Sequence, residues 1–464
     1  MLFNSWIFFL FLPLVVAFNF AIPHKYRWLL LLIASYVFYG WWRAEFLVMI
    51  AFSTVLDFIC AKQIEDAPSD KLRKRWMLLS VITNLSILFL FKYFYFFIGT
   101  APFMQSIVNE HQSLKSAVEF LGKSLPVGIS FYTFQTMSYT LDVYYKRAKV
   151  ERHLGQLALF VSFFPQLVAG PIERFTQLND QLKQKQIFTY HNIQMGLRLM
   201  LYGFFVKMVI ADNLSYTVTS VFSDPGKWVY YWNIIGVLSF GFQIYADFFG
   251  YSLIAQGAAK CFGIDLMDNF NRPYLSHNIS EFWKRWHISL STWFKDYVYI
   301  PLGGNRVSNV KWIVNILLVF LLSGLWHGAN YTFIVWGGLH GVYYLIERYS
   351  PIRMKASVLK MALTFLAVAF AWIFFRASSM QEAWQVIQGC VNHLQGQKQL
   401  DTQPFVFLLL LLFGLFECYR GDQRFDAYCQ QLPMLRRWAL YCFMLFCLLV
   451  LCGSEYSTFI YFKF

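Results

Sequence analysis

Long apolar runs recur from one end of the sequence to the other, and they decide in which solvent the chain can fold. Of the 464 residues, 58% are hydrophobic and 14% are charged, whereas soluble chains carry about 25% charged residues. A helix of about 20 mostly apolar residues crosses a bilayer core. The sequence therefore predicts an all-α polytopic integral membrane protein with about 10–12 transmembrane helices. The candidate spans are 2–21, 27–42, 45–61, 76–98, 125–145, 193–212, 229–262, 311–326, 330–347, 358–375, 404–419 and 437–453.

The connections between these runs are short, and no internal repeat or low-complexity tract interrupts them. We therefore expect residues 1–464 to form a single membrane domain. The apolar segment 154–170 is shorter than the others and ends in Ala-Gly-Pro. Such a segment suits a re-entrant helix, which is allowed at membrane depth only where protein or a water-filled cavity covers its backbone.

The distribution of basic residues predicts the topology. The N-terminal run MLFNSWIFFLFLPLVVAF has no basic residue before it and no small-residue cleavage site after it, so we interpret it as a first span rather than a signal peptide. The loops 62–75, 146–152, 348–355 and 420–437 are basic, whereas 99–123, 213–227 and 377–403 are nearly balanced. The positive-inside rule then places both chain ends outside the cytoplasm. The net charge of +14 is scattered over short loops, which favours topology signals and headgroup contacts over nucleic-acid binding.

The segment between about 264 and 310 is aromatic but carries a charge every few residues, so it cannot span lipid. Phe282, Trp286 and Leu290 would share one face of a helix. One interpretation is a plain interfacial helix. The other is a cytoplasmic vestibule in which basic side chains meet an anionic donor, such as the phosphates of coenzyme A. The basic residues in question are Lys284, Arg285, Lys295 and Arg306.

His327 is the outstanding ionisable residue at membrane depth, where such groups are expensive and indicate function. It stands in LLSGLWHGANYTF between Gly324 and Gly328, and small residues let another backbone or a substrate approach closely. The alternative is a buried histidine that only hydrogen-bonds a neighbouring helix. His287, in WKRWHISL, is the second candidate, with interfacial amphipathicity as its alternative. His340, in GGLHG, is better explained by helix packing.

Polar residues also interrupt the run SFGFQIYADFFGYS, where Gln243 and Asp247 are predicted to line a cavity. Pairing with Lys207 is the structural alternative for Asp247. The chain has no CxxC pair, no Cys/His ligand spacing, no GxSxG elbow and no Walker motif, so neither a metal site nor a serine nucleophile is predicted. From the residues alone, a transporter that relays protons through His327 and Asp247 fits about as well as an enzyme.

Several long motifs decide between these readings. The string KRWHISLSTWFKDYVYIPLGGNR is followed after one short span by SGLWHGANYTFIVWGGLHG. Three further motifs stand earlier in the chain: LPVGISFYTFQTMSYTLDVYY, FFPQLVAGPIERF and ADFFGYSLIAQGAAKCFGIDLMDNFNRPY. They resemble the membrane-bound O-acyltransferase (MBOAT) family, and most closely its bacterial branch that acetylates alginate or D-alanylates teichoic acid. The resemblance covers roughly residues 1–375 and is densest at 125–347. It implies a ring of helices around a thinned centre with a central tunnel.

The resemblance implies an intramembrane catalytic histidine at His327 and a second characteristic position at His287. We expect His327 to act as general base between a thioester donor and a hydroxyl acceptor. Asn330, Trp326 or backbone N–H groups near Gly328 are the candidates for stabilising the oxyanion. The tentative donor-binding or substrate-binding set is completed by Lys284, Arg285, Trp286, Asp247 and Gln243.

The resemblance also implies the substrates and the setting. Acetyl-coenzyme A is the expected donor, with no bound cofactor and no metal, and a carrier-protein thioester is the alternative, as in D-alanyl transfer. The expected acceptor is an extracellular polysaccharide, reached directly or through a periplasmic SGNH-type acetyltransferase. No nucleic-acid partner is expected. The expected location is the bacterial inner membrane.

Overall fold

The computed structural model describes the chain apart from most of residues 101–125 and apart from 169, 351–354, 393–397, 401–403, 453–458 and 461–464. The described residues form helices with short connections, together with one isolated bridge between Trp228 and Lys398. The chain divides into two compact units, Met1–Leu197 with Ala255–Met267, and Arg198–Ile254 with Asp268–Phe464. The expected single membrane domain concerns the chain as a whole and stays a prediction.

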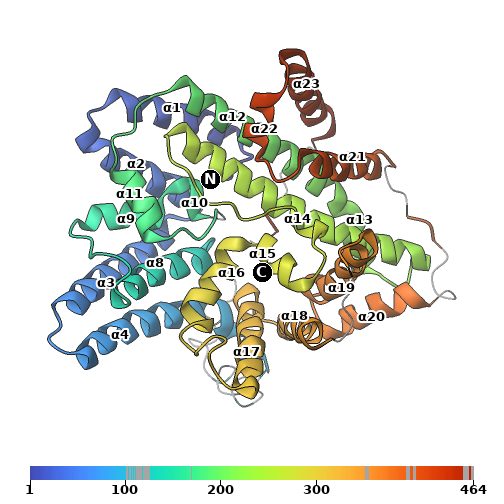
Figure 1. Cartoon of the computed structure of the whole chain (residues 1–464), viewed down its shortest axis with the longest axis horizontal. Helices are drawn as coiled ribbons and strands as arrows, with labels where there is room; N and C mark the ends of the chain where they lie inside the picture. Colours follow the sequence, from blue (N-terminus) through green and yellow to red (C-terminus); the bar gives the residue numbers. More distant parts are fainter. Residues whose placement is uncertain are drawn as a thin grey trace. The chain divides into compact units, whose positions relative to one another are not determined.

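The first unit holds the blue to teal helices of Figure 1. It also contains the beginning of α12 (Tyr190–Phe204) and the end of α14 (Tyr230–Cys261). Its other helices are α1 (Trp6–Ala21), α2 (His24–Gly40), η1 (Ala44–Phe46), α3 (Leu47–Asp66), α4 (Asp70–Leu88), η2 (Phe89–Tyr93), α5 (Phe94–Thr100), α8 (Ile129–Tyr144), α9 (Leu154–Ser162), α10 (Phe164–Leu167) and α11 (Phe175–Lys183).

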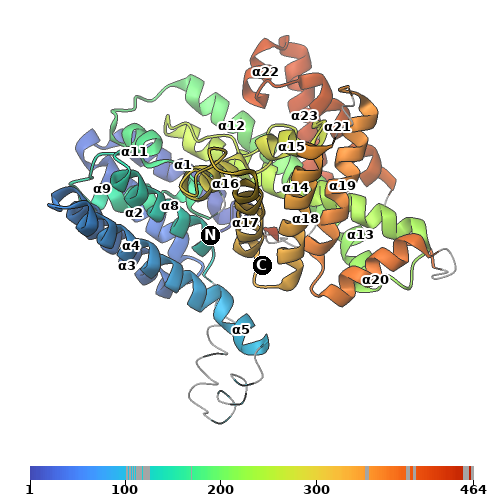
Figure 2. The ribbon, with the colours of Figure 1, turned by 60° about the horizontal axis from the view of Figure 1, so that its bottom comes forward.

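Three helices of this unit, α3, α4 and α8, lie side by side (Figure 2). Polar groups join them at membrane depth. The buried Asp57 carboxylate of α3 accepts hydrogen bonds from Ser80 Oγ at 2.5 Å and from Asn84 Nδ2 at 3.0 Å, both on α4. Interhelical hydrogen bonds of this kind hold helices together where apolar burial gives little driving force.

The segment expected to be re-entrant, 154–170, forms two short helices instead of one. Helix α9 ends at Ser162 and α10 runs from Phe164 to Leu167, with Phe163 between them. Both are buried within the first unit from Leu157 onward. Protein therefore covers the broken backbone, as a re-entrant segment requires.

The second unit begins with the end of α12 and most of α14. Its remaining helices are η3 (Phe205–Ala211), α13 (Asp212–Ser223), η4 (Pro273–Leu275), α15 (Ile279–Arg285), α16 (Ile288–Phe294), η5 (Lys295–Tyr299), α17 (Asn309–His327), α18 (Tyr331–Tyr349), α19 (Val358–Arg376), α20 (Met380–Val391), α21 (Pro404–Arg420), α22 (Phe425–Gln431) and α23 (Met434–Leu451).

One predicted boundary is wrong. The sequence predicts a helix that ends at residue 212, followed by a loop over 213–227. Instead, the helix continues through the π-helical turn η3 into α13 and ends at Ser223. The polar side chains at the start of α13 have their hydrogen-bond and ion-pair partners within the same continuous helix. Asn213 Nδ2 donates to the carbonyl of Val209 at 3.0 Å, and Asp212 pairs with Lys207 at 2.6 Å.

Helices α17, α18 and α19 run next to one another in the second unit (Figure 2). Glycines set the distance between α17 and α18. A Cβ atom on Gly324 would lie 2.3 Å from the carbonyl oxygen of Phe333, and one on Gly337 would lie 2.4 Å from that of Phe320. The two backbones are therefore in direct contact, and this contact fixes the end of α17.

Seven helical stretches among the described residues are long and apolar enough to cross a membrane, or eight if the bent pair α21 and α22 forms one span. The seven are Ala44–Asp66, Asp70–Ile98, Tyr190–Ser223, Tyr230–Cys261, Asn309–His327, Val358–Arg376 and Met434–Leu451. Helices also occupy the shorter predicted spans at α1, α2, α8 and α18. The all-α polytopic architecture is confirmed.

Candidate active site

His327 is the last residue of α17, at the turn that leads into α18. Its side chain is 3% exposed. The imidazole ring lies 5.0 Å from the ring of Trp336 and 5.2 Å from that of Phe375, measured between centroids. The next residue, Gly328, has no room for a side chain, because a Cβ atom there would lie 2.1 Å from the ring of Phe333. Aromatic side chains thus enclose the imidazole of His327, with Trp336 and Phe375 in contact with it and Phe333 packed against Gly328.

His287 lies where the sequence predicted a continuous helix, and here the prediction is wrong. Helix α15 ends at Arg285 and α16 starts at Ile288, so the chain breaks at Trp286 and His287. The backbone of His287 is left-handed, with φ of +41°. Its Nδ1 accepts the N–H of Leu290 at 3.4 Å and so caps α16. The three residues that were predicted to share one helix face are nevertheless all buried, since Phe282, Trp286 and Leu290 are each 1% exposed.

The two histidines meet in the interior of the second unit. Their ring centroids are 6.4 Å apart. The indole of Trp326 lies beside both rings, at 5.9 Å from His287 and 5.0 Å from His327. Phe248 of α14 also contacts His287 edge-on, with ring centroids 4.7 Å apart. The sequence thus singled out both histidines, and the structure brings them together.

The protonation of His287 follows from its surroundings. The residue is fully buried in the segment between the spanning helices α14 and α17, and burial lowers the pKa of His287 from 6.5 to about 3. The imidazole is therefore neutral near pH 7. Because Nδ1 accepts a backbone N–H, we assign the single ring proton to Nε2. A neutral imidazole in this form offers a hydrogen-bond donor at Nε2.

An apolar cavity of about 420 Å³ is lined by residues of α15, α16 and α17. Ile288, which follows His287, and Ser323, one helical turn before His327, are part of its wall. Lys284 and Lys295 also line it. The other lining residues are Ser280, Trp283, Ser291, Thr292, Phe294, Tyr299, Ile316, Val319, Phe320 and Tyr344.

A second, more polar cavity of about 990 Å³ adjoins the apolar one. The two share Ser280, Tyr299 and Tyr344 in their walls. Arg348 and Lys360 line the polar cavity near the end of α18 and the start of α19. Because α17 and α18 form a hairpin whose turn carries His327, these basic residues lie at the opposite end of the hairpin from the histidine.

Two of the tentatively predicted residues have other partners. Arg285 pairs with Glu281 at 2.8 Å and lies 3.9 Å from Asp422, and it does not line either cavity, whereas its neighbour Lys284 does. Trp286 is packed among aromatic rings of the interior, with Phe270 at 5.0 Å. These positions indicate structural roles for the two side chains.

Asn330 is engaged on both sides of its amide. Its Oδ1 accepts the N–H of Thr332 at 3.1 Å and caps α18, and its Nδ2 donates to the carbonyl of Ser378 at 2.6 Å. Of the oxyanion-stabilising candidates on the α17–α18 turn, Trp326 is the one that contacts both histidine rings.

Asp247 lies on α14 next to Phe248, and the predicted structural alternative is present. Lys207 Nζ pairs with Asp247 at 2.7 Å and with Asp212 at 2.6 Å. Asp247 also accepts the backbone N–H of Ile460 at 2.7 Å, which brings residues near the end of the chain toward the histidines. Gln243 is half-buried one turn earlier on α14.

Some residues near the site carried no distinctive sequence signal. Trp283 lines the apolar cavity and its Nε1–H donates to His340 Nδ1 at 3.3 Å, so His340 orients a wall of the cavity as well as packing. Phe375 reaches His327 from α19, outside the densest motifs. Within the described residues no group of three or more His, Cys, Asp or Glu side chains could hold a metal ion.

Comparison with known proteins agrees with this architecture. The model of the membrane-bound O-acyltransferase family matches residues 82–383. The chain is 38% identical to a protein of Pseudomonas aeruginosa named probable alginate O-acetylase AlgI, over 90% of this chain and 82% of the relative. It is 37% identical to the peptidoglycan O-acetyltransferase of Helicobacter pylori, over 78% of this chain and 73% of the relative. The teichoic acid D-alanyltransferase of Bacillus subtilis is 30% identical over 64% of this chain and 76% of its own length. This multi-pass membrane protein belongs to the membrane-bound O-acyltransferase family and is an O-acyltransferase.

Proposed function

We propose that the protein moves an acetyl group from cytoplasmic acetyl-coenzyme A to hydroxyl groups of an extracellular polysaccharide, with His327 as the general base. One observation carries the proposal. The wall of the apolar cavity beside α17 includes Ile288, which follows His287, and Ser323, one helical turn before His327, together with two lysines. The relatives named as alginate and peptidoglycan O-acetyltransferases support acetyl as the acyl group and a glycan as the acceptor.

The donor enters from the end of the α17–α18 hairpin that carries basic residues. Arg306 and Lys311 flank the start of α17, and Arg348 lies near the end of α18. By the positive-inside rule this end faces the cytoplasm. The polar cavity suits the phosphates and nucleotide of coenzyme A, and the apolar cavity suits its thin pantetheine arm. From Ile316 to Ser323 the apolar cavity follows α17 for about 10 Å along the helix axis.

The reaction is an acyl transfer from sulfur to oxygen. His327 takes the proton of the acceptor hydroxyl while that oxygen attacks the thioester carbonyl carbon. A C–O bond forms, and the carbonyl oxygen becomes an oxyanion. When the tetrahedral intermediate collapses, the C–S bond breaks and the leaving thiolate receives the proton from His327. The products are an acetyl ester and a free thiol, so the base is restored in each cycle.

His287 has the features of the oxyanion's hydrogen-bond donor. Its backbone-anchored ring is neutral and carries its proton on Nε2, within the same aromatic enclosure as His327. A fixed donor of this kind stabilises the charge that develops on the carbonyl oxygen, an effect of about 3–4 kcal/mol for one donor in other enzymes. Trp326 lies beside both rings and is the second candidate donor.

The acceptor reaches His327 from the other side of the membrane, because the α17–α18 turn lies opposite the basic end. A polysaccharide hydroxyl is the simplest acceptor. A hydroxyl of a periplasmic SGNH-type acetyltransferase, which then relays the group to the glycan, requires the same chemistry at His327. Both chain ends are proposed to lie outside the cytoplasm of a bacterial inner membrane.

Incubating the purified protein in nanodiscs with radiolabelled acetyl-coenzyme A tests the proposal. Wild type is compared with His327→Ala and with the control His191→Ala, which alters an exposed histidine of the first unit. We expect thioester cleavage in wild type and the control, and its loss in His327→Ala. Equal turnover in all three proteins would exclude His327 as the base. Turnover only with a carrier-protein thioester would exclude coenzyme A as donor. A carrier-protein thioester is the donor expected if the chain resembles the D-alanyltransferases in its chemistry.

A further inference from the structure

A short backbone clip encloses His287. The N–H of Asn271 donates to the carbonyl of Arg285, and the N–H of Ile288 donates to the carbonyl of Asn269, both at 2.9 Å. The Asn269 side chain adds a bond, since its Oδ1 accepts Ser289 Oγ–H at 2.6 Å. Residues 269–271 therefore hold the chain on both sides of His287, and they determine where its imidazole points.

The clip keeps two residues in an unfavourable backbone conformation. Arg272 and His287 have φ angles of +47° and +41°, in the left-handed region that side chains other than glycine rarely adopt. Each such residue costs of order 1 kcal/mol and persists only where the surrounding contacts enforce it. The clip therefore needs support from outside the segment 269–289.

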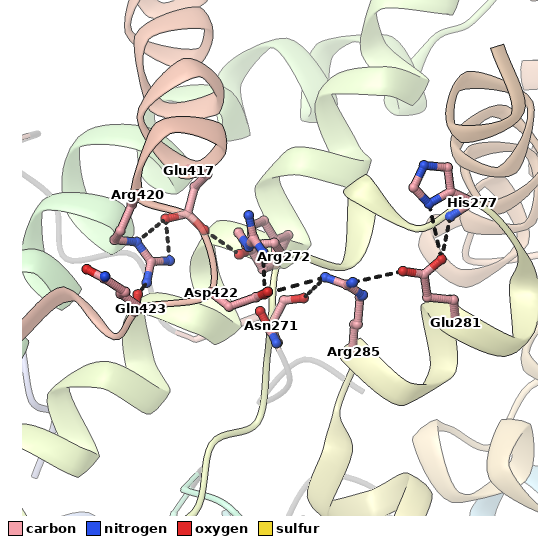
Figure 3. Close-up of polar contacts among 10 residues, drawn as sticks. Asn271, Arg272, His277, Glu281, Arg285, Glu417, Arg420, Asp422 and Gln423 are labelled. Atoms are coloured by element: carbon pink, nitrogen blue, oxygen red, sulfur yellow. Dashed lines mark hydrogen bonds and ion pairs between the residues drawn. The ribbon is translucent and has the colours of Figure 1, made fainter. Parts of the chain in front are cut away.

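Asp422 supplies a contact at this point, from the turn between α21 and α22. Its carboxylate forms an ion pair and hydrogen bond with Arg272 and lies 3.9 Å from Arg285 Nη1 (Figure 3). Arg285 also donates from Nη1 to the carbonyl of Asn271 at 3.4 Å, and pairs with Glu281 at 2.8 Å. One carboxylate thus reaches the arginines at both ends of the clip.

The charges explain why this contact matters. The Arg272 side chain is only 12% exposed, and that of Arg285 is 24% exposed. Their backbones must lie together for the Asn271–Arg285 hydrogen bond to form. Without a carboxylate between them, the two guanidinium groups repel each other, and Arg272 loses the counter-charge of a largely buried cation. The hydrogen bond from Arg272 also holds the pKa of Asp422 below its ordinary value, so the carboxylate is charged at neutral pH.

We propose that Asp422 is a positioning residue for the acyl transfer, which neutralises Arg272 and Arg285 and thereby keeps His287 in its left-handed, active conformation. Asp422 lies outside the stretch 82–383 that matches the family model, so the α21–α22 turn extends the active site beyond that stretch. The role in catalysis rests on the proposed function. The role in holding the clip does not, because it concerns backbone geometry alone.

The test compares Asp422→Asn with two matched variants, Asp422→Glu, which keeps the charge, and Asp265→Asn, which removes the exposed partner of Lys260 in the first unit. We expect Asp422→Asn to lower kcat about tenfold, which corresponds to one modest catalytic interaction, with little change in the KM for acetyl-coenzyme A. High salt should restore part of the lost kcat, because ions screen the two arginines. Adding Arg272→Asn to Asp422→Asn should also restore it, since asparagine tolerates the left-handed backbone.

Amide hydrogen exchange over residues 269–289 supplies a readout that needs no turnover. We expect faster exchange in Asp422→Asn than in wild type, Asp422→Glu and Asp265→Asn. Unchanged exchange together with unchanged kcat would overturn the proposal, and so would a loss of kcat that neither salt nor Arg272→Asn relieves. If wild type cleaves no thioester, the proposed function fails, while the exchange comparison still decides whether Asp422 holds the clip.

Discussion

The imidazole rings of His287 and His327 lie 6.4 Å apart between centroids, with an angle of 64° between their planes. Each ring is fixed by a helix terminus. His327 ends α17, and His287 caps the start of α16 through its Nδ1. The rings of Phe248 against His287, and of Trp336 and Phe375 against His327, leave little room for either imidazole to rotate. The pair therefore offers two fixed imidazoles for the two proposed tasks, a base for the acceptor hydroxyl and a hydrogen-bond donor for the carbonyl oxygen.

The lowered pKa of His287 predicts a pH dependence of stability. Its folded-state pKa of about 3 lies below the ordinary 6.5, so the unfolded chain takes up the proton first as the pH falls. The contribution of neutral His287 is fully present above about pH 6.5 and is lost progressively between about pH 6.5 and pH 3. Between pH 7.5 and 4.5 we expect wild type to lose about 3 kcal/mol through this group.

His287→Asn tests this dependence, because asparagine can cap α16 and tolerates the left-handed backbone. Thermal unfolding in nanodiscs at the two pH values should show a smaller acid-induced drop for His287→Asn than for wild type. The carboxylates titrate alike in both proteins, so the difference between them reports on His287. An exposed-histidine control, His191→Asn, should behave as wild type. Equal drops in His287→Asn and wild type would show that His287 is not held neutral by burial.

The close contact of α17 and α18 predicts opposite effects for two adjacent glycines. A methyl group at Gly337 would lie 2.4 Å from the Phe320 carbonyl oxygen, whereas one at Gly338 would meet only Leu321 Cδ2, at 3.7 Å. We expect Gly337→Ala to separate the helices, displace His327 and lower both the unfolding temperature and kcat. Gly338→Ala should be neutral or stabilising by up to about 1 kcal/mol, because alanine favours the helix. Equal behaviour of the two variants in unfolding and turnover assays would contradict this packing.

The sequence predicted the histidines and the helical architecture because these depend on local signals. An ionisable residue inside an apolar run is conspicuous, and hydrophobic length identifies helices without knowledge of their packing. The break at Trp286–His287 had no such signal. The spacing of Phe282, Trp286 and Leu290 fits one continuous helix equally well. The break depends on the hydrogen bond that the Asn271 N–H donates to Arg285 and on the one that the Asn269 carbonyl accepts from Ile288.

Long-range partners also explain the other differences. The sequence near His327 could not show that Asn330 caps α18 and donates from Nδ2 to the carbonyl of Ser378. Asp422 lies in a short charged turn, and nothing in its sequence context distinguishes it from an ordinary solvent-exposed aspartate. The helix over 213–223 was missed because this stretch is more polar than the apolar run before it, and the bond from Asn213 Nδ2 to the carbonyl of Val209 could not be assigned from the sequence.

The lining of the apolar cavity predicts a role for Lys284 in donor binding. Its ammonium group is exposed at the cavity wall. Removing one charge that attracts the anionic donor toward this cavity costs about 1 kcal/mol at solvent-exposed distances. Lys284→Gln should therefore raise the KM for acetyl-coenzyme A about fivefold, with kcat retained and with a weaker dependence on salt. Lys71→Gln, which removes an exposed charge of the first unit outside both cavities, is the matched control. A KM that is equal in both variants would place the donor elsewhere.

The ion pairs of Lys207 predict the largest effect on stability. Its side chain is 4% exposed and neutralises Asp212 at 2.6 Å and Asp247 at 2.7 Å. Lys207→Met leaves buried carboxylates without this counter-charge, which costs about 3–5 kcal/mol. Lys260→Met breaks the more exposed pair with Asp265 and should cost less than about 1 kcal/mol. Adding Asp247→Asn to Lys207→Met should recover part of the loss, because the two side chains interact directly. Thermal unfolding of the four proteins measures these differences. Asp247 also accepts the N–H of Ile460, and its neighbour Phe248 contacts His287. We therefore expect Lys207→Met to lower kcat even at temperatures where the variant is folded. A Lys207→Met protein that unfolds like wild type would show that the carboxylates are neutralised in another way.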